Sequence, residues 1–199
     1  MKYKRELVIL ITVLAAVIFC ITLYRAVFYA ATDEIPLPPG VTDEALANKD
    51  SALYPVTLSI PKINVQAKIT DVGITSRGNM GTPTNYSDVG WYRYGILPGQ
   101  LGSAVMAGHV DNGLSLPGVF SNLKDLSIGD DVYVATVGGE RLHFIVSAVD
   151  TYDFNDKGTN VFKEKDAKLL RLITCTGSWV SQYKTHDKRL VVTAVLSSK

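Results

Sequence analysis

Three residues in this chain have the chemistry of a cysteine acyl-transfer site. Cys175 closes an apolar run over residues 169–175, His109 closes another apolar run, and Arg189 opens a third. A thiolate can attack an acyl group, an imidazole can move the protons, and a guanidinium can stabilise the oxyanion that forms. We expect a neighbouring imidazolium or guanidinium to raise the thiolate fraction of Cys175.

The N-terminus predicts export. Residues 7–24 contain no charge, and their eighteen residues are near the lower limit for spanning a hydrocarbon core of about 30 Å. The cations that precede them predict a cytoplasmic N-terminus: Lys2, Lys4 and Arg5. We expect residues 1–31 to form a cytoplasmic tip and an uncleaved, single-pass transmembrane anchor. A cleavable signal peptide is the alternative, but its apolar region is usually only about 7–15 residues long.

This topology leaves Cys175 unpaired, because the other cysteine, Cys20, lies inside the apolar segment. Exported cysteines are usually paired, so a single extracellular thiol favours chemistry over a disulfide. The alternative is that Cys175 packs as a small hydrophobic residue. Likewise, His109 could be structural and Arg189 could be a surface cation, but their positions at strand ends favour a site.

Charge and composition divide the rest of the chain. The chain has a net charge of +1, of which residues 1–31 carry +3 and the remainder −2. The remainder lacks the basic field that nucleic-acid binding requires, so we expect no nucleic-acid partner. Residues 32–55 are polar and Pro-rich and predict an extracellular spacer, in which Thr42 could cap a short helix over 42–49. Residues 56–199 are long enough for one catalytic domain.

Strand patterns dominate this domain. The predicted strands are residues 56–60, 65–69, 103–108, 131–137, 141–149, 169–175 and 190–196. Gly138-Gly139 predicts a hairpin between two of them. Seven or eight short strands favour an all-β fold with a closed or nearly closed barrel. Helical spacing predicts one short helix at 119–126, and a second is expected within 160–167.

The other two histidines are weaker candidates. His143 lies on the polar side of a predicted strand, which predicts a surface position, and His186 lies in a polar segment that we expect to be a loop. Thr176-Gly177-Ser178 predicts that the strand ends directly after the thiol.

Several motifs resemble one enzyme family. Leu172-Ile173-Thr174-Cys175 followed by Arg189, with Gly108-His109 upstream, resembles the active-site signature of the sortases, although Arg171 replaces a threonine of the family pattern. Sortases are membrane-anchored cysteine transpeptidases of Gram-positive bacteria and their relatives. Further motifs, spread over about residues 56–196, resemble class F sortases: Ile60-Pro61-Lys62-Ile63, Gly81-Thr82-Pro83, Asp88-Val89-Gly90-Trp91-Tyr92, Pro98-Gly99, Gly102-Ser103-Ala104-Val105 and Ala107-Gly108-His109-Val110-Asp111.

The resemblance implies a sortase-like closed eight-stranded β-barrel behind a transmembrane helix. It implies that Cys175 attacks the Thr–Gly bond of an LPxTG-like sorting signal and forms a thioacyl-enzyme. His109 would protonate the leaving amine and activate the incoming one, and Arg189 would stabilise the oxyanion or position the peptide. The acceptor would be an amine, such as a peptidoglycan precursor, or water, and the catalytic domain would be extracellular.

A sortase groove must accept the Leu and Pro side chains of its signal. Strand position makes these residues candidate walls: Val105, Ala107, Leu172, Ile173, Val191 and Val192. Thr174 resembles a family position near the substrate threonine, and Trp179 could line the groove or anchor a loop. Some sortases bind calcium, but the loose acidic group Asp150, Asp153 and Asp156 has no EF-hand pattern, so we expect no metal and no cofactor.

Two other function classes remain open. An L,D-transpeptidase also uses cysteine and histidine, but its Ser-x-Gly-Cys context is missing because Thr174 precedes the thiol. The other class is a non-catalytic extracellular β-domain that binds peptides. Ready labelling of Cys175 that is lost when His109 is replaced would favour an enzyme.

Overall fold

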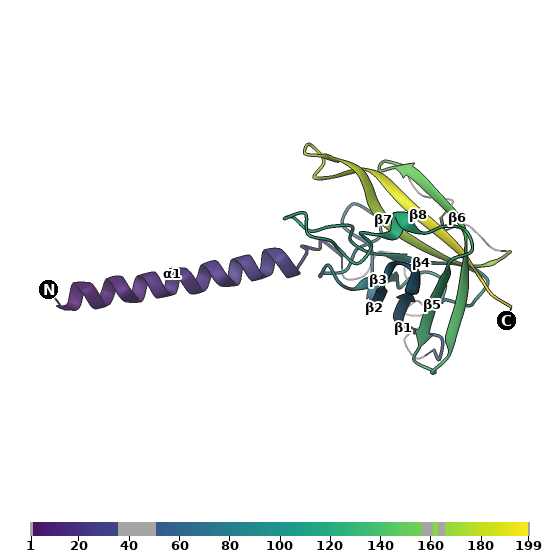
Figure 1. Cartoon of the computed structure of the whole chain (residues 1–199), viewed down its shortest axis with the longest axis horizontal. Helices are drawn as coiled ribbons and strands as arrows, with labels where there is room; N and C mark the ends of the chain where they lie inside the picture. Colours follow the sequence, from purple (N-terminus) through teal and green to yellow (C-terminus); the bar gives the residue numbers. More distant parts are fainter. Residues whose placement is uncertain (1, 36–50, 157–160, 163–165, 199) are drawn as a thin grey trace.

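The computed structural model describes residues 2–35, 51–156, 161–162 and 166–198. The helix expected at 42–49 and most of the one expected within 160–167 lie outside these residues. One long helix, α1 (Lys2–Phe28), projects from a domain made mostly of strands (Figure 1).

Helix α1 has the length and composition of a membrane span. It contains a candidate span, Tyr3–Phe28, whose most apolar 18-residue window has a mean hydropathy of 2.9 and is not buried against the rest of the chain. At about 1.5 Å per residue these 26 residues extend for about 39 Å, which exceeds the hydrocarbon thickness of about 30 Å. The helix continues four residues beyond the predicted uncharged run and includes Arg25 in its last turn.

The segment after α1 is fastened to the domain. The amide of Ala30 donates to the carbonyl of Thr84 at 2.7 Å, and the carboxylate of Glu34 lies 2.7 Å from the guanidinium of Arg93. Both side chains of this ion pair are mostly buried, which protects it from screening by solvent. The outer end of α1 therefore has a defined place beside the barrel.

Eight strands close into the predicted barrel, in the order β1-β2-β3-β4-β7-β8-β6-β5. Their bounds are β1 (Pro55–Ile60), β2 (Val65–Val72), β3 (Val89–Tyr92), β4 (Gly102–Ala107), β5 (Asp131–Thr136), β6 (Arg141–Asp153), β7 (Lys168–Val180) and β8 (Thr185–Leu196). The pairs β2–β3 and β4–β7 are parallel, and the remaining pairs are antiparallel.

The core fills the barrel because alternate strand residues point inward. The side chains of Leu58, Phe144 and Leu170 are fully buried there. The predicted hairpin at Gly138-Gly139 joins β5 to β6, and Gly139 has a φ of +84°, which glycine adopts at no steric cost.

The prediction of a helix at residues 119–126 is wrong. The segment forms turns and one short 3-10 helix, η4 (Leu123–Asp125). The amide of Leu123 donates to the carbonyl of Phe120, and that of Leu126 donates to Leu123, both with the three-residue spacing of a 3-10 turn. Phe120, Leu123 and Leu126 are buried, so the apolar spacing reflects packing onto the barrel rather than an α-helix. A second 3-10 turn, η3 (Pro61–Ile63), connects β1 to β2.

The strand carrying Cys175 does not end at the thiol, contrary to the sequence expectation. Strand β7 continues to Val180 through a register shift between Thr176 and Trp179, and β8 begins four residues before Arg189. Gly177 lies in this bulge with a φ of +82°, a left-handed conformation that suits glycine. Thus β7 and β8 form a hairpin that projects past the barrel (Figure 1).

Candidate active site

The parallel pairing of β4 with β7 places His109 beside Cys175. Ala107 pairs with Ile173 in this register, and the Gly108 amide donates to the Ile173 carbonyl at 3.1 Å. Two residues further along each chain come His109 and Cys175. Their adjacency therefore follows from strand register.

The antiparallel pairing of β7 with β8 brings Arg189 to the same place. Cys175 and Arg189 are direct cross-strand partners, so their side chains lie on the same face of the sheet. The strand register thus brings the positions of His109, Cys175 and Arg189 to one end of the β4–β7–β8 sheet.

The residues expected to line a groove lie on both faces of the sheet, because side chains alternate along each strand. Ala107, Ile173 and Val191 lie on the outer face with the thiol, and Ile173 and Val191 belong to an apolar cluster with Val105. Leu172 and Val192, which were also expected as walls, instead pack inside the barrel because they have the opposite strand parity.

Thr174 likewise points away from the thiol. It is buried, and its hydroxyl donates to the carbonyl of Gly108 at 2.8 Å. This bond joins β7 to the residue directly before His109, so Thr174 is placed to hold the two chains of the site together.

His109 is held by the loop between β2 and β3. Its Nε2 lies 2.9 Å from the carbonyl oxygen of Pro83, and its ring centroid lies 4.9 Å from that of Tyr86. Because a carbonyl can only accept, the proton of the neutral ring is on Nε2 and Nδ1 is free to act as a base. Burial lowers the pKa of His109 below its usual value, although the Pro83 hydrogen bond and the charge of Asp111 act in the opposite direction.

Burial is also the largest influence on the pKa of the Cys175 thiol. It raises the pKa of Cys175, and it outweighs Arg189 and a hydrogen bond with the Thr185 hydroxyl, both of which lower it. The charge of Asp111 raises this pKa further. The guanidinium does favour the thiolate as expected, but burial disfavours the charged forms of both the thiol and the imidazole.

Arg189 is anchored rather than free at the surface. Its Nη1 donates to the carbonyls of His186 at 3.0 Å and Lys188 at 2.8 Å, and its Nη2 donates to the Thr185 hydroxyl at 2.9 Å. Three N–H groups are thereby committed, and the remaining ones are available to an oxyanion. This fixed orientation is what electrostatic preorganisation requires.

Sequence reasoning missed Thr185. Its hydroxyl contacts both the Arg189 guanidinium and the Cys175 thiol, so it connects two of the three candidate groups. The signal was hidden because residues 181–188 read as a polar loop, whereas Thr185 begins β8 and pairs with Val180.

Asp111 was also missed as a site residue. It follows His109 by two positions, and its charge acts on both the imidazole and the thiol. Its Oδ2 lies 3.5 Å from Nε2 of His186, while Nδ1 of His186 lies 3.2 Å from the carbonyl of Gly177. His186 is therefore part of a wall between the His109 loop and the β7–β8 hairpin.

His143 lies elsewhere, as its strand parity predicted. It is on β6, where its Nε2 lies 2.6 Å from a carboxylate oxygen of Asp131 and its ring stacks on Tyr133.

Within the described residues, no group of three or more His, Cys, Asp or Glu side chains is arranged to hold a metal ion. In the acidic group considered for calcium, Asp153 pairs with the ammonium of Lys188 at 2.5 Å.

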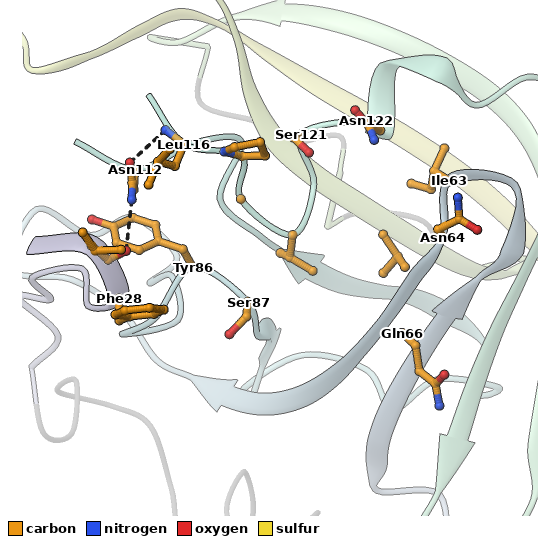
Figure 2. Close-up of a pocket in the computed structure, with 15 residues that line it drawn as sticks. Phe28, Ile63, Asn64, Gln66, Tyr86, Ser87, Asn112, Leu116, Ser121 and Asn122 are labelled. Atoms are coloured by element: carbon orange, nitrogen blue, oxygen red, sulfur yellow. Dashed lines mark hydrogen bonds between the residues drawn. The ribbon is translucent and has the colours of Figure 1, made fainter. Parts of the chain in front are cut away.

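A cavity of about 590 Å³ lies next to the candidate site, between the end of α1 and the barrel (Figure 2). Phe28, Tyr86, Asn112 and Val119 contribute to its lining. Tyr86 also contacts His109, whereas neither His109 nor Cys175 lines the cavity.

A closed eight-stranded barrel with a cysteine, a histidine and an arginine at one sheet end is an architecture suited to cysteine acyl transfer. The family model of the sortase domain matches residues 58–197, and the chain therefore belongs to the sortase family, whose members are cysteine transpeptidases. Among curated proteins, no significant sequence match to this chain is found.

Solved structures agree on the fold. The chain is similar to sortase C-1 from Actinomyces oris, with 25% identity, coverage of 88% of each chain and a TM-score of 0.63. It is also similar to sortase C1 from Streptococcus agalactiae, with 22% identity, coverage of 81% of this chain and 79% of the other, and a TM-score of 0.61.

Proposed function

We propose that this sortase is membrane-anchored, cleaves an LPxTG-like sorting signal between Thr and Gly, and transfers the acyl group to an amine such as a peptidoglycan precursor. The observation that carries the proposal is the strand register that gathers Cys175, His109 and Arg189 at one sheet end. The acceptor can also be water, in which case the result is hydrolysis.

The first step generates the nucleophile. The thiol proton passes to Nδ1 of His109, and the Cys175 thiolate attacks the threonine carbonyl carbon. The oxyanion of the tetrahedral intermediate is stabilised by the uncommitted N–H groups of Arg189. The intermediate then collapses, the C–N bond breaks, and the imidazolium gives its proton to the departing glycine amine.

The second half reverses these roles. The incoming amine attacks the thioester carbonyl while His109 accepts one of its protons. The C–S bond breaks, and the sulfur leaves as a thiolate that regains its proton from the imidazolium. Since burial lowers the pKa of His109 and raises that of Cys175, it disfavours the reactive thiolate–imidazolium pair. The resting thiol is thereby protected from unspecific reactions.

The outer sheet face provides apolar walls for the substrate. Ala107, Ile173 and Val191 share this face with the thiol. Ala107 and Val191 are buried, so of these three Ile173 offers the accessible apolar surface to the Leu or Pro side chain of the signal. Thr174 supports the threonine position indirectly, because its bond to Gly108 sets the backbone directly before His109. No metal or other cofactor enters the reaction.

The anchor places the enzyme where exported substrates emerge. In this proposal residues 1–31 hold the cytoplasmic tip and the membrane span, residues 32–55 form the spacer, and residues 56–199 form the extracellular catalytic domain. The hydropathy of α1 and the cations near its start support this topology. The sequence motifs support a place among the class F sortases.

Peptide cleavage and transfer test the proposal. The full chain in detergent is incubated with an LPxTG peptide and a triglycine amine, and the products are separated and weighed. Cys175→Ala should abolish both cleavage and transfer, whereas Cys20→Ala, which changes the cysteine in α1, should retain them. Cleavage by the Cys175→Ala variant, or none by the unaltered chain, would reject the proposed reaction.

A further inference from the structure

The outer end of α1 is joined to a loop of the active site. The side-chain amide of Asn112 donates to the carbonyl of Val27 at 3.0 Å. Its oxygen accepts from the amides of Leu114 at 2.9 Å and Leu116 at 3.0 Å. Figure 2 shows Asn112 between Leu116 and the end of α1. Asn112 is buried, so these bonds fix the 112–116 loop at the level where the helix ends.

Asp111, the residue directly before this loop, contacts the β7–β8 hairpin. Asp111 lies 3.5 Å from His186 of β8, and the ring of His186 packs edge-on against Trp179 of β7 with centroids 5.5 Å apart. A continuous series of contacts therefore runs from α1 through the 112–116 loop to the hairpin. In Figure 1 the hairpin projects from the barrel on the side where α1 enters.

This end of the domain exposes large apolar side chains. Leu114 and Leu116 of the loop are 53% and 47% exposed, and Trp179 and Tyr183 of the hairpin are 58% and 52% exposed. Lys184 lies beside Tyr183 and is also exposed. These side chains belong to two segments that the Asp111–His186 contact brings together, and exposed apolar groups on adjoining segments mark a contact surface.

The end of α1 also carries exposed aromatic side chains. Tyr24, Phe28 and Tyr29 are each about half exposed, and the ring of Tyr24 lies 4.8 Å from that of Phe28 and 6.1 Å from that of Tyr29. Aromatic rings of this kind gather where a transmembrane helix leaves the hydrocarbon for the headgroups.

We infer that the 112–116 loop and the tip of the β7–β8 hairpin lie in the lipid interface of the membrane that α1 spans. Leu114, Leu116, Trp179 and Tyr183 would enter the headgroup region, and Lys184 would meet lipid phosphates. Lipid is the occupant because the surface is continuous with the end of the anchor through Asn112. This inference rests on the proposed membrane anchor.

The inference gives the active site an orientation. The 112–116 loop begins three residues after His109, and the hairpin carries Thr185 and Arg189, so the membrane-facing segments form part of the active-site rim. A rim held at the bilayer would meet substrates that are themselves attached to the membrane, which raises their effective concentration.

Tryptophan fluorescence tests this face, because the chain has only two tryptophans and Trp91 is buried inside the barrel. The full chain is reconstituted into vesicles of phosphatidylcholine and phosphatidylglycerol whose acyl chains carry bromine near the headgroup. Bromine quenches only nearby indoles. Trp179 emission, obtained as the difference between the unaltered chain and Trp179→Phe, should be lost in brominated vesicles and retained in unbrominated ones.

A matched control distinguishes this face from exposure in general. Val137 is 61% exposed beside the β5–β6 turn, which Figure 1 places far from α1. A tryptophan introduced as Val137→Trp in the Trp179→Phe chain should keep its emission in brominated vesicles. Equal quenching at positions 137 and 179 would overturn the inference.

The outcomes separate the inference from the function on which it rests. A chain that floats with vesicles but keeps its Trp179 emission overturns the inference alone. A chain that does not float overturns the anchor and the inference together. Peptide cleavage in detergent remains an independent measure of the proposed reaction.

Discussion

Replacing Thr185 by valine should make the Cys175 thiol less reactive without removing any of the three candidate catalytic groups. The Thr185 hydroxyl accepts a hydrogen bond from Arg189 at 2.9 Å and makes a hydrogen bond that lowers the pKa of Cys175. Valine keeps the branched shape of threonine and loses both polar contacts of the hydroxyl. The variant therefore isolates the link between guanidinium and thiol.

The size of the effect follows from the charge on sulfur. A hydrogen bond to a charged group contributes about 1.5–3 kcal/mol, and sulfur is a weak acceptor, so we take the lower end of this range. Losing a bond of this strength raises the thiol pKa, and about 1.4 kcal/mol corresponds to a tenfold change in an equilibrium constant. The thiolate fraction at pH 7, and with it the alkylation rate, should fall about tenfold.

The assay is the rate of Cys175 alkylation by iodoacetamide as a function of pH, followed by intact mass. The rates for the variant and the unaltered chain should converge at high pH, where both thiols are ionised. Thr193→Val serves as the control, because Thr193 is buried on the same strand and lies away from the thiol. If Thr185→Val leaves the alkylation profile unmoved, the hydroxyl does not stabilise the thiolate and the reasoning is refuted.

Two further predictions concern the neighbours of the site. The charge of Asp111 raises the pKa of both His109 and Cys175. Asp111→Asn should therefore move both limbs of the pH profile of kcat/KM to lower pH. Limbs that stay in place would contradict this electrostatic role. Gly108→Ala should lower both activity and stability, by about 1–3 kcal/mol in unfolding experiments, because the new Cβ would lie only 2.6 Å from the ring of Phe120. Denaturant unfolding that matches the unaltered chain would show that Phe120 can move aside.

The barrel could be predicted because its signals are local. Alternating residues such as those of 56–60, and the Gly138-Gly139 turn between 131–137 and 141–149, specify strands and a hairpin without knowledge of distant partners. The segment 119–126 was misread because burial of Phe120, Leu123 and Leu126 imitates helical spacing.

The candidate site was predictable only in its residue types. The positions of His109, Cys175 and Arg189 at the ends of apolar runs indicated chemistry, and strand register then explains why they meet. The contributions of Thr185 and Asp111 could not be predicted, because they depend on a bulge and on a loop contact between distant segments.

The protonation state of the site was equally beyond sequence reasoning. The sequence indicated that a nearby cation would favour the thiolate, and Arg189 does act in that direction. The degree of burial decides the outcome, and it is a property of the closed barrel and its loops rather than of any motif.

The most direct test of the central claim is the intact mass of the protein after brief incubation with an LPxTG peptide and no added amine. We predict an adduct equal to the peptide acyl group up to threonine, mapped to Cys175, that disappears when a triglycine amine is added. The adduct should be absent in His109→Ala and Arg189→Ala. Product formation with no adduct on Cys175, or an adduct on another residue, would contradict the account.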